Sequence, residues 1–315
     1  MTSLVSIIVP VYNGENHIRE CLISCVDSSN TNIEVIVVND GSTDSTESLI
    51  NDLKNEFHNV FSINQSNQGV SVARNNGLKR ASGEYIIFVD SDDSLELSLL
   101  PQLISRISSL NLDAIVPYNY SICDGKYKRH YERLQGQCLK YPNFYRFDDS
   151  DTLSDLRSSI CGIVFRRDFL LNIDLEFRSI SIGEDSLFFL EFYLSGARIS
   201  FFDVDFYKVN IRRDSASRSI SVDRLEGLIK GLGYYSNLYS IFRSPGAKKL
   251  ISLKYYRITS TIANVLAGMS KSDRKTLILE LSKCVKIEYT FSLNSLKYYL
   301  ANRHLGFMVN LLSWR

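Results

Sequence analysis

Three carboxylates stand close together directly after a strand-like run of apolar residues. The run Tyr85–Val89 is continuously apolar, and Asp90, Asp92 and Asp93 follow it within four residues. Like charges at this spacing repel one another, so each carboxylate resists ionisation unless a cation or water compensates. Mg²⁺ and Mn²⁺ take oxygen ligands and often join one or two carboxylates to a substrate phosphate. The pattern indicates a hard-cation site; the alternative is a solvated acidic turn in which Asp92 or Asp93 caps the next helix.

Other ionisable residues outside this run have two interpretations each. Asp40 follows the apolar run 34–39, and it is either a turn or cap residue or an acceptor for the imide N–H of uracil. Arg74 lies in an expected helix, where it is either an exposed arginine or a partner for pyrophosphate. Glu184 and Asp185 precede an apolar helix, where they supply either ordinary helix N-terminal charge or a general base for a hydroxyl proton.

The elements that must position these residues alternate between strands and helices. We expect strands at 4–11, 34–39, 60–63, 85–89 and 114–118, and helices at 17–26, 47–53, 70–80 and 97–110. Continuous apolar strands that alternate with helices predict an α/β fold with a mainly parallel sheet, covered on both faces. Ligands of such sheets bind beyond the carboxyl ends of the strands. The first, second and fourth strands all end in polar residues, which we therefore expect to converge at one edge.

The rest of the chain is less regular and then becomes helical. The segment 119–146 is irregular, 159–165 has the pattern of a strand, and a helix begins at Asp168. An aromatic helix follows Asp185, and 199–211 is extended. The pattern is helical from about residue 216 to the end, with Pro245 and Gly246 as a break.

Composition and charge divide the chain in two. Its 315 residues are 44% hydrophobic and 23% charged, which is ordinary for globular proteins and long enough for two domains. The net charge of +1 conceals an asymmetry: residues 216–315 hold 16 Lys+Arg and 5 Asp+Glu, and the other 215 hold 20 and 30. A basic part of this kind suggests a nucleic-acid or membrane partner.

Targeting signals and cysteine spacing indicate a reducing compartment. The N-terminus lacks the pattern of a signal peptide, and no apolar run reaches the length of a spanning helix. The six cysteines contain no CxxC pair, so we expect buried free thiols. These observations predict a cytoplasmic protein.

Four blocks of the sequence carry a family resemblance. In order along the chain they are VSIIVPVYNGENHIRECLISC, IEVIVVNDGSTDST, NQGVSVARNNGLKRASGEYIIFVDSDDS and GEDSLFFLEF. Together they resemble family 2 glycosyltransferases, which have the GT-A fold, over about the first 215 residues. The resemblance implies a catalytic domain at 1–215, with a donor half at about 1–118 and an acceptor half at 119–215. A smaller basic helical domain at 216–315 follows it.

The resemblance also implies an activity: inverting transfer from a nucleotide-diphosphate sugar, usually a UDP-sugar, with Mn²⁺ or Mg²⁺. Its nucleotide-binding positions fall on Pro10, Tyr12, Asn13, Glu15, Asp40, Gly41 and Ser42. Asp40 matches the residue that reads the base. Arg74 matches the arginine near the nucleotide and its diphosphate.

Asp90, Ser91 and Asp92 match the DxD motif of this family. Asp92 is the implied metal ligand, and Asp90 is placed nearer the ribose or a metal-bound water. Asp93 is implied to support the acceptor side or to cap the helix.

Asp185 matches the catalytic base, and Glu184 is its neighbour. Arg212, Arg213 and Ser215 resemble a later block that closes over the donor. No histidine follows that block, so the family's histidine metal ligand has no match here.

These matches predict a hexosyl- or N-acetylhexosaminyltransferase that uses a UDP-sugar. The predicted acceptor is a saccharide, lipid-linked in surface polysaccharide or lipo-oligosaccharide biosynthesis. Binding to the anionic inner face of the cell membrane would explain the basic C-terminal part; the alternative is a helical domain with solvated charges. No nucleic-acid motif accompanies the charge, so we expect no such partner.

Two rival functions remain at this stage. One is a non-catalytic protein that binds nucleotide sugars. The other is a phosphatase of the haloacid-dehalogenase type, whose motif FVDSDDS matches faintly. Ser94 stands where that family usually has Thr or Val, and the motif follows the fourth strand instead of the first.

Overall fold

The computed structural model describes residues 5–26, 32–121, 145–146, 159–210 and 222–268. The chain divides into two compact units. The first comprises Met1–Ser179 with Glu184–Ser219, and the second comprises Ile180–Gly183 with Ile220–Arg315. The domain boundary predicted at 215/216 lies outside the described residues.

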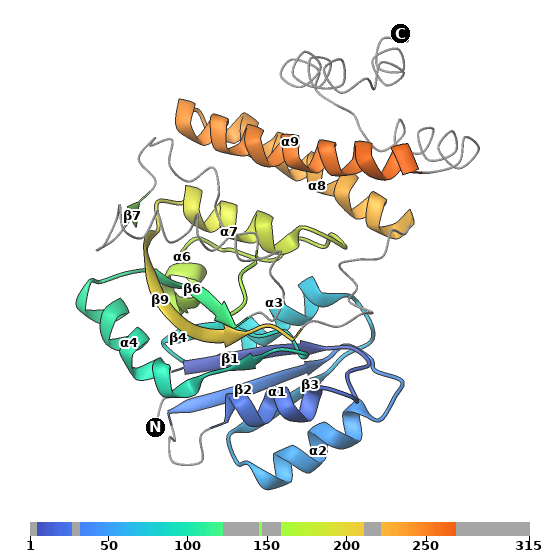
Figure 1. The fold of residues 1–315 in the computed structure, drawn as a ribbon, viewed down its shortest axis with the longest axis vertical. Helices are drawn as coiled ribbons and strands as arrows, with labels where there is room; N and C mark the ends of the chain where they lie inside the picture. Colours follow the sequence, from blue (N-terminus) through green and yellow to red (C-terminus); the bar gives the residue numbers. More distant parts are fainter. Residues whose placement is uncertain (1–4, 27–31, 122–144, 147–158, 211–221, 269–315) are drawn as a thin grey trace. The chain divides into compact units, whose positions relative to one another are not determined.

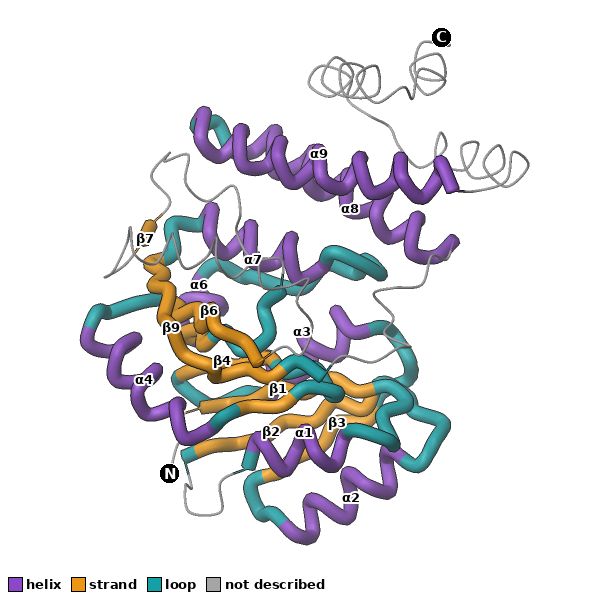
Figure 2. The backbone as a smooth tube through the Cα atoms, in the orientation of Figure 1, coloured by secondary structure: helices purple, strands orange, loops and turns teal. Residues whose placement is uncertain are grey.

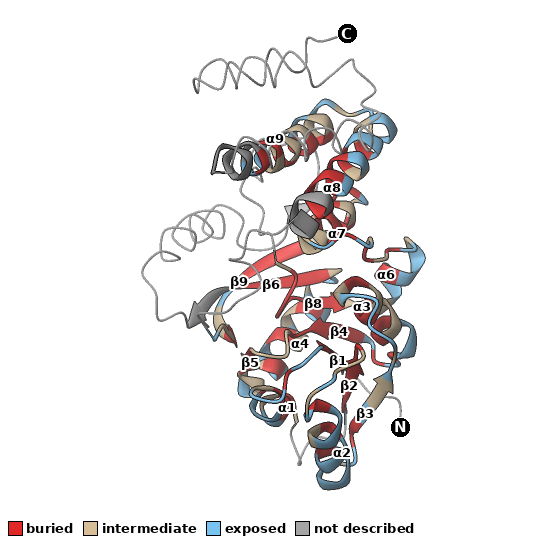
Figure 3. Cartoon of the chain, turned by 90° about the vertical axis from the view of Figure 1, so that its right-hand side faces the viewer, coloured by how far each residue is buried: buried red, intermediate tan, exposed pale blue. Residues whose placement is uncertain are grey.

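The first part of the chain forms the parallel α/β layers that its apolar pattern predicts. The strands are β1 (Val5–Val11), β2 (Ile33–Asn39), β3 (Val60–Asn64) and β4 (Tyr85–Phe88), and they lie parallel in the order β3-β2-β1-β4. The helices are α1 (Ile18–Cys25), α2 (Thr46–Glu56) and α3 (Val70–Arg80). Every residue of β1, β2 and β4 is buried, as a sheet covered on both faces requires (Figure 3).

The helices cover opposite faces of this sheet. In Figures 1 and 3, α1 and α2 lie side by side on one face and α3 lies on the other. Helix α3 approaches β1 closely at Gly77, where a Cβ would lie 2.4 Å from Ile8 Cγ2. A glycine at this point therefore lets α3 sit directly on the sheet.

The second part of the first unit extends the same sheet. Its strands are β5 (Ser94–Leu95), β6 (Ala114–Ser121), β7 (Tyr145–Arg146), β8 (Val164–Arg166) and β9 (Arg198–Lys208). Its helices are η1 (Leu97–Leu99), α4 (Leu100–Ser109), α6 (Arg167–Asn172) and α7 (Glu184–Leu194). The strand order continues β4-β8-β6-β9-β5, with β8 antiparallel to β4 and β6, and β6 parallel to β9. The sheet is thus parallel in its first part and mixed in its second.

Two of the boundaries that differ from the sequence expectation have a clear physical cause. Strand β8 begins at Val164 instead of residue 159, because Gly162 has a φ of +75° and donates its N–H to Phe88 O at 2.9 Å. This left-handed residue ends the extended backbone before Val164. Strand β6 runs to Ser121, where we expected irregular chain from residue 119, because β9 supplies a parallel partner along its length.

An aromatic cluster fixes α7 against the sheet. Phe177 stacks on Phe188 with ring centroids 4.0 Å apart, and Phe88 of β4 meets both rings edge-on. Phe165 of β8 contacts Phe188 and Phe192 of α7 in the same way. Aromatic pairs of this kind add to the stabilisation from burial. The N-terminus of α7 is therefore held at a fixed place relative to β4.

The second unit contains α8 (Val222–Ile241) and α9 (Pro245–Gly268), which pack against each other. The break predicted at Pro245 is confirmed, and this proline begins α9, a position that suits its missing N–H. No helix among the described residues of the chain is long and apolar enough to span a bilayer.

Candidate functional site

The carboxyl ends of β1, β2 and β4 meet at one edge of the sheet, which we name the carboxyl edge. Val11 pairs with Asn39 at the ends of β1 and β2, and Asp40 N donates to Val11 O at 2.8 Å. Val89 N donates to Ile8 O at 3.0 Å beside the end of β4. Figure 2 shows the loops that leave β1 and β2 on the same side of the sheet. The convergence predicted from the three polar strand ends is confirmed.

The loops after β1 and β2 are tied together by side chains that the sequence predicted to bind nucleoside. Asn13 Oδ1 accepts from Thr43 N at 2.8 Å, and Glu15 Oε2 accepts from Ser45 N at 3.0 Å. Asn13 N donates in return to Ser42 Oγ at 2.9 Å. In this structure Asn13, Glu15 and Ser42 therefore position the two loops that frame the carboxyl edge.

Pro10 and Tyr12 lie on the β1 side of the same edge. Pro10 is buried within β1. Strand β4 has already ended beside it, so the N–H that a proline lacks would have had no strand partner on that side. The Tyr12 side chain follows it and is 50% exposed. An exposed aromatic ring beside the strand ends is suited to stack on a flat ligand.

Asp40 is buried and organises the loop that leads into α3. Its Oδ1 accepts from Gln65 Nε2 and Gln68 N, and its Oδ2 accepts from Gly69 N, each at 2.8 Å. Gly41 has a φ of +73°, and a Cβ there would lie 2.7 Å from a backbone nitrogen of the same loop. Asp40 thus has a structural task, and one acceptor position of Oδ2 is left beyond these three bonds.

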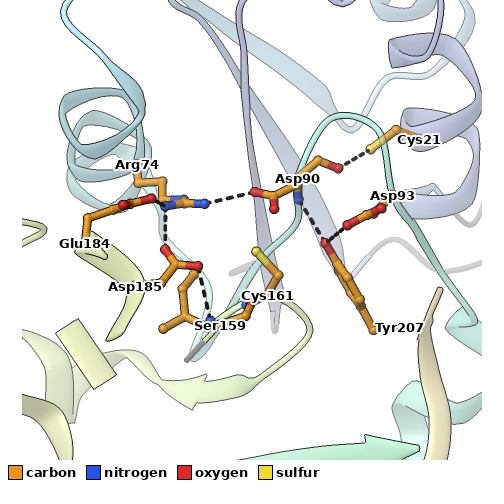
Figure 4. A network of polar contacts seen from close by, with 10 residues as sticks. Cys21, Arg74, Asp90, Asp93, Ser159, Cys161, Glu184, Asp185 and Tyr207 are labelled. Atoms are coloured by element: carbon orange, nitrogen blue, oxygen red, sulfur yellow. Dashed lines mark hydrogen bonds and ion pairs between the residues drawn. The ribbon is translucent and has the colours of Figure 1, made fainter. Parts of the chain in front are cut away.

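Arg74 is the centre of the polar network drawn in Figure 4. Its Nη1 lies 2.6 Å from Asp185 Oδ1 and 3.2 Å from Glu184 Oε1, and its Nη2 lies 2.9 Å from Asp90 Oδ1. The Arg74 side chain is 3% exposed, so the interpretation as an ordinary exposed helical arginine is wrong. Helix α3, helix α7 and the end of β4 therefore meet through one guanidinium.

The guanidinium of Arg74 is also held from its apolar side. Its Cζ lies 5.3 Å from the centre of the Phe177 ring. The neighbouring Asn75 fixes the backbone of Phe177 by two bonds, from Phe177 N to Asn75 Oδ1 at 2.8 Å and from Asn75 Nδ2 to Phe177 O at 2.9 Å. Burial alone would lower the pKa of Arg74, but Asp185 and Asp90 hold that pKa well above its ordinary value. The arginine is a permanent charge in this position.

Asp185 has the properties that a general base at neutral pH needs. Burial raises the pKa of its carboxyl to about 7; Arg74 acts in the opposite direction, and Glu184 and Asp90 add to the rise. Its Oδ2 also accepts from Ile160 N at 3.5 Å. A carboxylate whose pKa lies near neutrality and whose orientation is fixed is well matched to proton transfer.

The turn Asp90–Asp93 carries the other carboxylates. Asp93 N donates to Asp90 O at 3.0 Å, which closes the turn, and Cys21 Sγ donates to the same oxygen at 3.5 Å. The Asp90 side chain is 40% exposed, and Ser91 and Asp92 are half-buried. The helix-cap alternative for Asp92 or Asp93 is wrong, because neither η1 nor α4 has a side-chain cap bond.

Tyr207 and Asn210 complete this turn and were missed at the level of sequence. Tyr207 OH donates to Asp93 Oδ2 at 2.6 Å and accepts from Asp90 N at 3.3 Å, and Asn210 N donates to Asp93 Oδ1 at 2.9 Å. Burial raises the pKa of Asp93 to about 7, and Tyr207 and Asn210 oppose that rise. Tyr207 lies in β9 and Asn210 lies just after it, more than a hundred positions along the chain from Asp93. No local sequence pattern predicts that β9 pairs with β5.

Cys161 is a further buried side chain beside this network (Figure 4). Burial, followed by Asp90 and Asp185, raises the pKa of its thiol well above the ordinary value, so it remains neutral. Cys21, Cys25 and Cys161 are buried free thiols, as predicted. Arg212 and Arg213, which the sequence predicted to close over the donor, lie outside the described residues, as does Ser215.

The donor set at the carboxyl edge fits a hard divalent cation. The guanidinium of Arg74 contacts three carboxylates directly. Asp92 and Asp93, in the same turn as Asp90, bring the number of carboxylates to five. Within the residues that the structure describes, no three ligating side chains are gathered into a ready-made metal site. This arrangement suits Mg²⁺ or Mn²⁺, which commonly binds through one or two carboxylates and completes its shell with substrate phosphate and water.

Comparison with known sequences decides the family. The profile described as Glycosyl transferase family 2 matches residues 6–173, more than half of the chain. The chain belongs to glycosyl transferase family 2. The resemblance drawn from the four sequence blocks is thereby confirmed, and the phosphatase interpretation of the DSDD turn is contradicted.

Several glycosyltransferases are similar to the chain over different shares of their own length. GlyA, a glycosyltransferase of Streptococcus pneumoniae, is 26% identical over 333 residues, which cover 96% of this chain and 47% of GlyA. The cholesterol galactosyltransferase of Borreliella burgdorferi is 25% identical over 277 residues, which cover 81% of this chain and 74% of that protein. The chain spans about half to two thirds of the length of GlyA and of YibD from Escherichia coli.

Solved structures confirm the GT-A fold. S. aureus TarS 1-349 in complex with UDP-GlcNAc matches with a TM-score of 0.66 at 21% identity, over 90% of this chain and 81% of that one. The mannosyltransferase PcManGT from Pyrobaculum calidifontis, in complex with GDP-Man and Mn²⁺, matches with a TM-score of 0.59 at 17% identity, over 96% and 86%.

Proposed function

We propose that the protein is an inverting glycosyltransferase that moves a hexosyl or N-acetylhexosaminyl group from a UDP-sugar to a saccharide hydroxyl. The observation that carries this proposal is the Asp185 carboxylate. It is fixed by Arg74 and Ile160 N, its pKa is raised to about 7, and it shares Arg74 with Asp90 at the carboxyl end of β4. A base and an acidic metal-binding turn are thus joined by one side chain.

The chemistry follows from these positions. Asp185 accepts the proton of the acceptor hydroxyl as its oxygen attacks the anomeric carbon. The new carbon–oxygen bond forms on the face opposite the breaking bond to phosphate, whose electron pair leaves with UDP. This single displacement inverts the anomeric centre. Asp92 and Asp90 would hold Mn²⁺ or Mg²⁺, which supplies positive charge for the leaving diphosphate.

The donor is assigned to the edge formed by β1 and β2. Asp40 would accept the imide N–H of uracil at its remaining acceptor position, and the exposed Tyr12 ring would lie against the nucleoside. The TarS complex with UDP-GlcNAc supports a UDP-sugar, because TarS shares this fold. The PcManGT complex with GDP-Man and Mn²⁺ supports the divalent cation and makes GDP-Man a necessary competitor in any test. Arg212 and Arg213 are proposed to close over the diphosphate.

The test is UDP or GDP release from a panel of UDP-sugars and GDP-Man, with Mn²⁺, with Mg²⁺ and after chelation. We expect metal-dependent release from one UDP-sugar, which Asp92→Ala abolishes. Asp203→Ala is the matched control, because Asp203 is exposed on β9 away from the turn. Metal-dependent UDP binding without turnover over an acceptor panel would favour the non-catalytic binder, and the absence of both would contradict the proposal.

We further propose that the acceptor is lipid-linked and that the second unit binds the anionic inner face of the cell membrane. Residues 227–272 contain seven Lys+Arg and no Asp or Glu. Ile241 and Tyr256, in α8 and α9, are exposed apolar side chains among these charges. Basic segments with exposed apolar residues gain from both anionic headgroups and the membrane interface.

Vesicle co-sedimentation tests the membrane proposal. We expect binding to vesicles with anionic lipid, weaker binding at high salt, and loss of binding when Arg243, Lys249 and Arg257 are changed together to glutamate. A triple change of Lys54, Lys79 and Arg80, exposed on α2 and α3, is the control. Equal sedimentation with neutral vesicles, or none with anionic vesicles, would contradict it.

A further inference from the structure

Arg74 is engaged by three carboxylates of its own chain through both terminal nitrogens, and its remaining donor, Nε, is buried and has no hydrogen-bond partner among the described residues. Its two terminal nitrogens contact Asp185, Glu184 and Asp90 within 3.2 Å. The face of the guanidinium lies over Phe177, and its side chain is 3% exposed. An arginine that grips an incoming phosphate needs free N–H groups directed at the ligand, usually two in parallel.

The geometry points to Arg74 as a positioning residue: it holds the general base Asp185 at the carboxyl edge and couples it to the DxD turn. This inference rests on the proposed function, and it gives Arg74 a task different from diphosphate binding. A guanidinium presents its donors in a rigid planar fork, so two carboxylates on opposite nitrogens are fixed in direction as well as in distance.

The surroundings of Arg74 are built to keep this arrangement. Asn75, the next residue of α3, makes two bonds to the backbone of Phe177, and Phe177 stacks on Phe188 of α7. Helix α7 begins with Glu184 and Asp185. Helix α3 and helix α7 are therefore fixed relative to each other by two further contacts beside Arg74: the hydrogen bonds of Asn75 to Phe177 and the stacking of Phe177 on Phe188.

Charge gives a second reason for this role. Three charged groups face Asp185. Arg74 faces it from α3, Glu184 from its own helix α7, and Asp90 from the end of β4. Without Arg74 the three carboxylates would repel one another with no cation between them. Arg74 thus keeps the base in its reactive, ionised form and within reach of the acceptor oxygen.

The decisive variant is Arg74→Lys, because it keeps a positive charge while a single ammonium cannot hold three carboxylates in the same geometry. We expect kcat to fall about 10- to 100-fold, within the range of acid–base assistance. The affinity for UDP, measured by calorimetry with Mn²⁺, should stay within about threefold, since the positioned group is the base. Arg178→Lys is the matched control, because Arg178 pairs with Glu191 in the middle of the same helix α7, at 3.0 Å.

A tenfold or greater loss of UDP affinity in Arg74→Lys with kcat retained would overturn the inference, and so would unchanged values of both. If Arg74→Lys does not fold, Arg74→Gln decides by the same two quantities. A fall in kcat with UDP affinity kept within about threefold supports the inference, and a tenfold loss of UDP affinity with kcat retained overturns it. Unaltered protein that binds UDP but turns nothing over contradicts the proposed function alone. Protein that does not bind UDP contradicts both.

Discussion

Glu34 is a buried carboxylate and Asp185 a half-buried one, both in the first unit, and their surroundings differ. Glu34 lies at the amino edge of the sheet, where β1, β2 and β4 begin, and its Oε1 accepts from Ser6 Oγ, Ser82 N, Ser82 Oγ and Gly83 N. Burial alone would raise the pKa of Glu34, but these neutral donors outweigh it and lower the pKa. Asp185, beside two other carboxylates, has its pKa raised to about 7.

The difference separates a carboxylate that stabilises the fold from one that is kept reactive. At the amino edge every donor satisfies the charged form, so ionised Glu34 ties β1, β2 and the entry to β4 together. At the carboxyl edge like charges are gathered around one arginine, which costs stability and leaves room for a cation and a proton. The direction of the pKa shift, taken with the contacts, tells the two edges apart.

The largest effect that tests this contrast is expected from Asp185→Asn. The change keeps size and shape but removes the base, so kcat should fall by about 10²–10⁴. The melting temperature should hold or rise, because a repelling charge disappears. The measurement is UDP release in the presence of acceptor, beside thermal unfolding. Asp168→Asn is the control, since Asp168 is an exposed aspartate in the first turn of α6. A variant that retained a tenth of the rate would remove Asp185 from the role of base.

Glu34→Ala should show the opposite profile. Its loss leaves buried N–H and O–H donors without an acceptor, so the free energy of unfolding should fall by about 3 kcal/mol. Activity per folded molecule should be unchanged, because the amino edge lies across the sheet from the site. Denaturant unfolding and kcat measure the two quantities. Glu56→Ala, at an exposed position of α2, is the control. A loss of kcat with full stability would break the contrast between the edges.

Much of the carboxyl edge could be predicted from local sequence. The apolar runs of β1, β2 and β4 and the polar residues that follow them fix both the parallel layers and the convergence of Asp40 and Asp90. Helix α3 was predicted at Val70–Arg80, as found, because the pattern ends at a clear stop. These features are local, and local features are what periodicity and turn chemistry report.

The contacts that join distant segments could not be predicted in this way. The pairing of Tyr207 with Asp93, the bond from Ile160 N to Asp185 and the three partners of Arg74 depend on the order of strands in the mixed part of the sheet. Glu34 gave no signal either, because a lone glutamate in an apolar strand has no pattern that announces its donors. Contacts between segments far apart in the chain decide which carboxylates are hydrogen-bonded by neutral donors and which are crowded by like charges.

Acidity offers a smaller and reversible test. Asp185 must be ionised to accept a proton, so the rate should fall below pH 7 by about tenfold for each pH unit. The folded-state pKa of Glu34 is lowered from 4.5, so its stabilisation is present above pH 4.5 and is lost only as pH falls through the lower value. The rate at saturating donor and the melting temperature, followed from pH 8 to about pH 2, should therefore decline in separate windows. A rate that stayed constant down to pH 5 would contradict the raised pKa of Asp185.

The smallest expected effect compares two buried tyrosines at either end of the β4 region. Tyr85 OH, at the start of β4, shares a hydrogen bond of 2.8 Å with Ser108 Oγ, and Tyr207 OH bonds to Asp93 beyond the end of β4. Each change to phenylalanine should lower the free energy of unfolding by about 1 kcal/mol, the usual contribution of one hydrogen bond. Only Tyr207→Phe should also lower kcat, by a few fold, and raise the concentration of Mn²⁺ needed for half-maximal rate, because it frees the turn that carries Asp92. Equal effects of the two changes on rate and metal requirement would mean that the turn is held without Tyr207, and that the carboxyl edge owes its order to Arg74 and the metal alone.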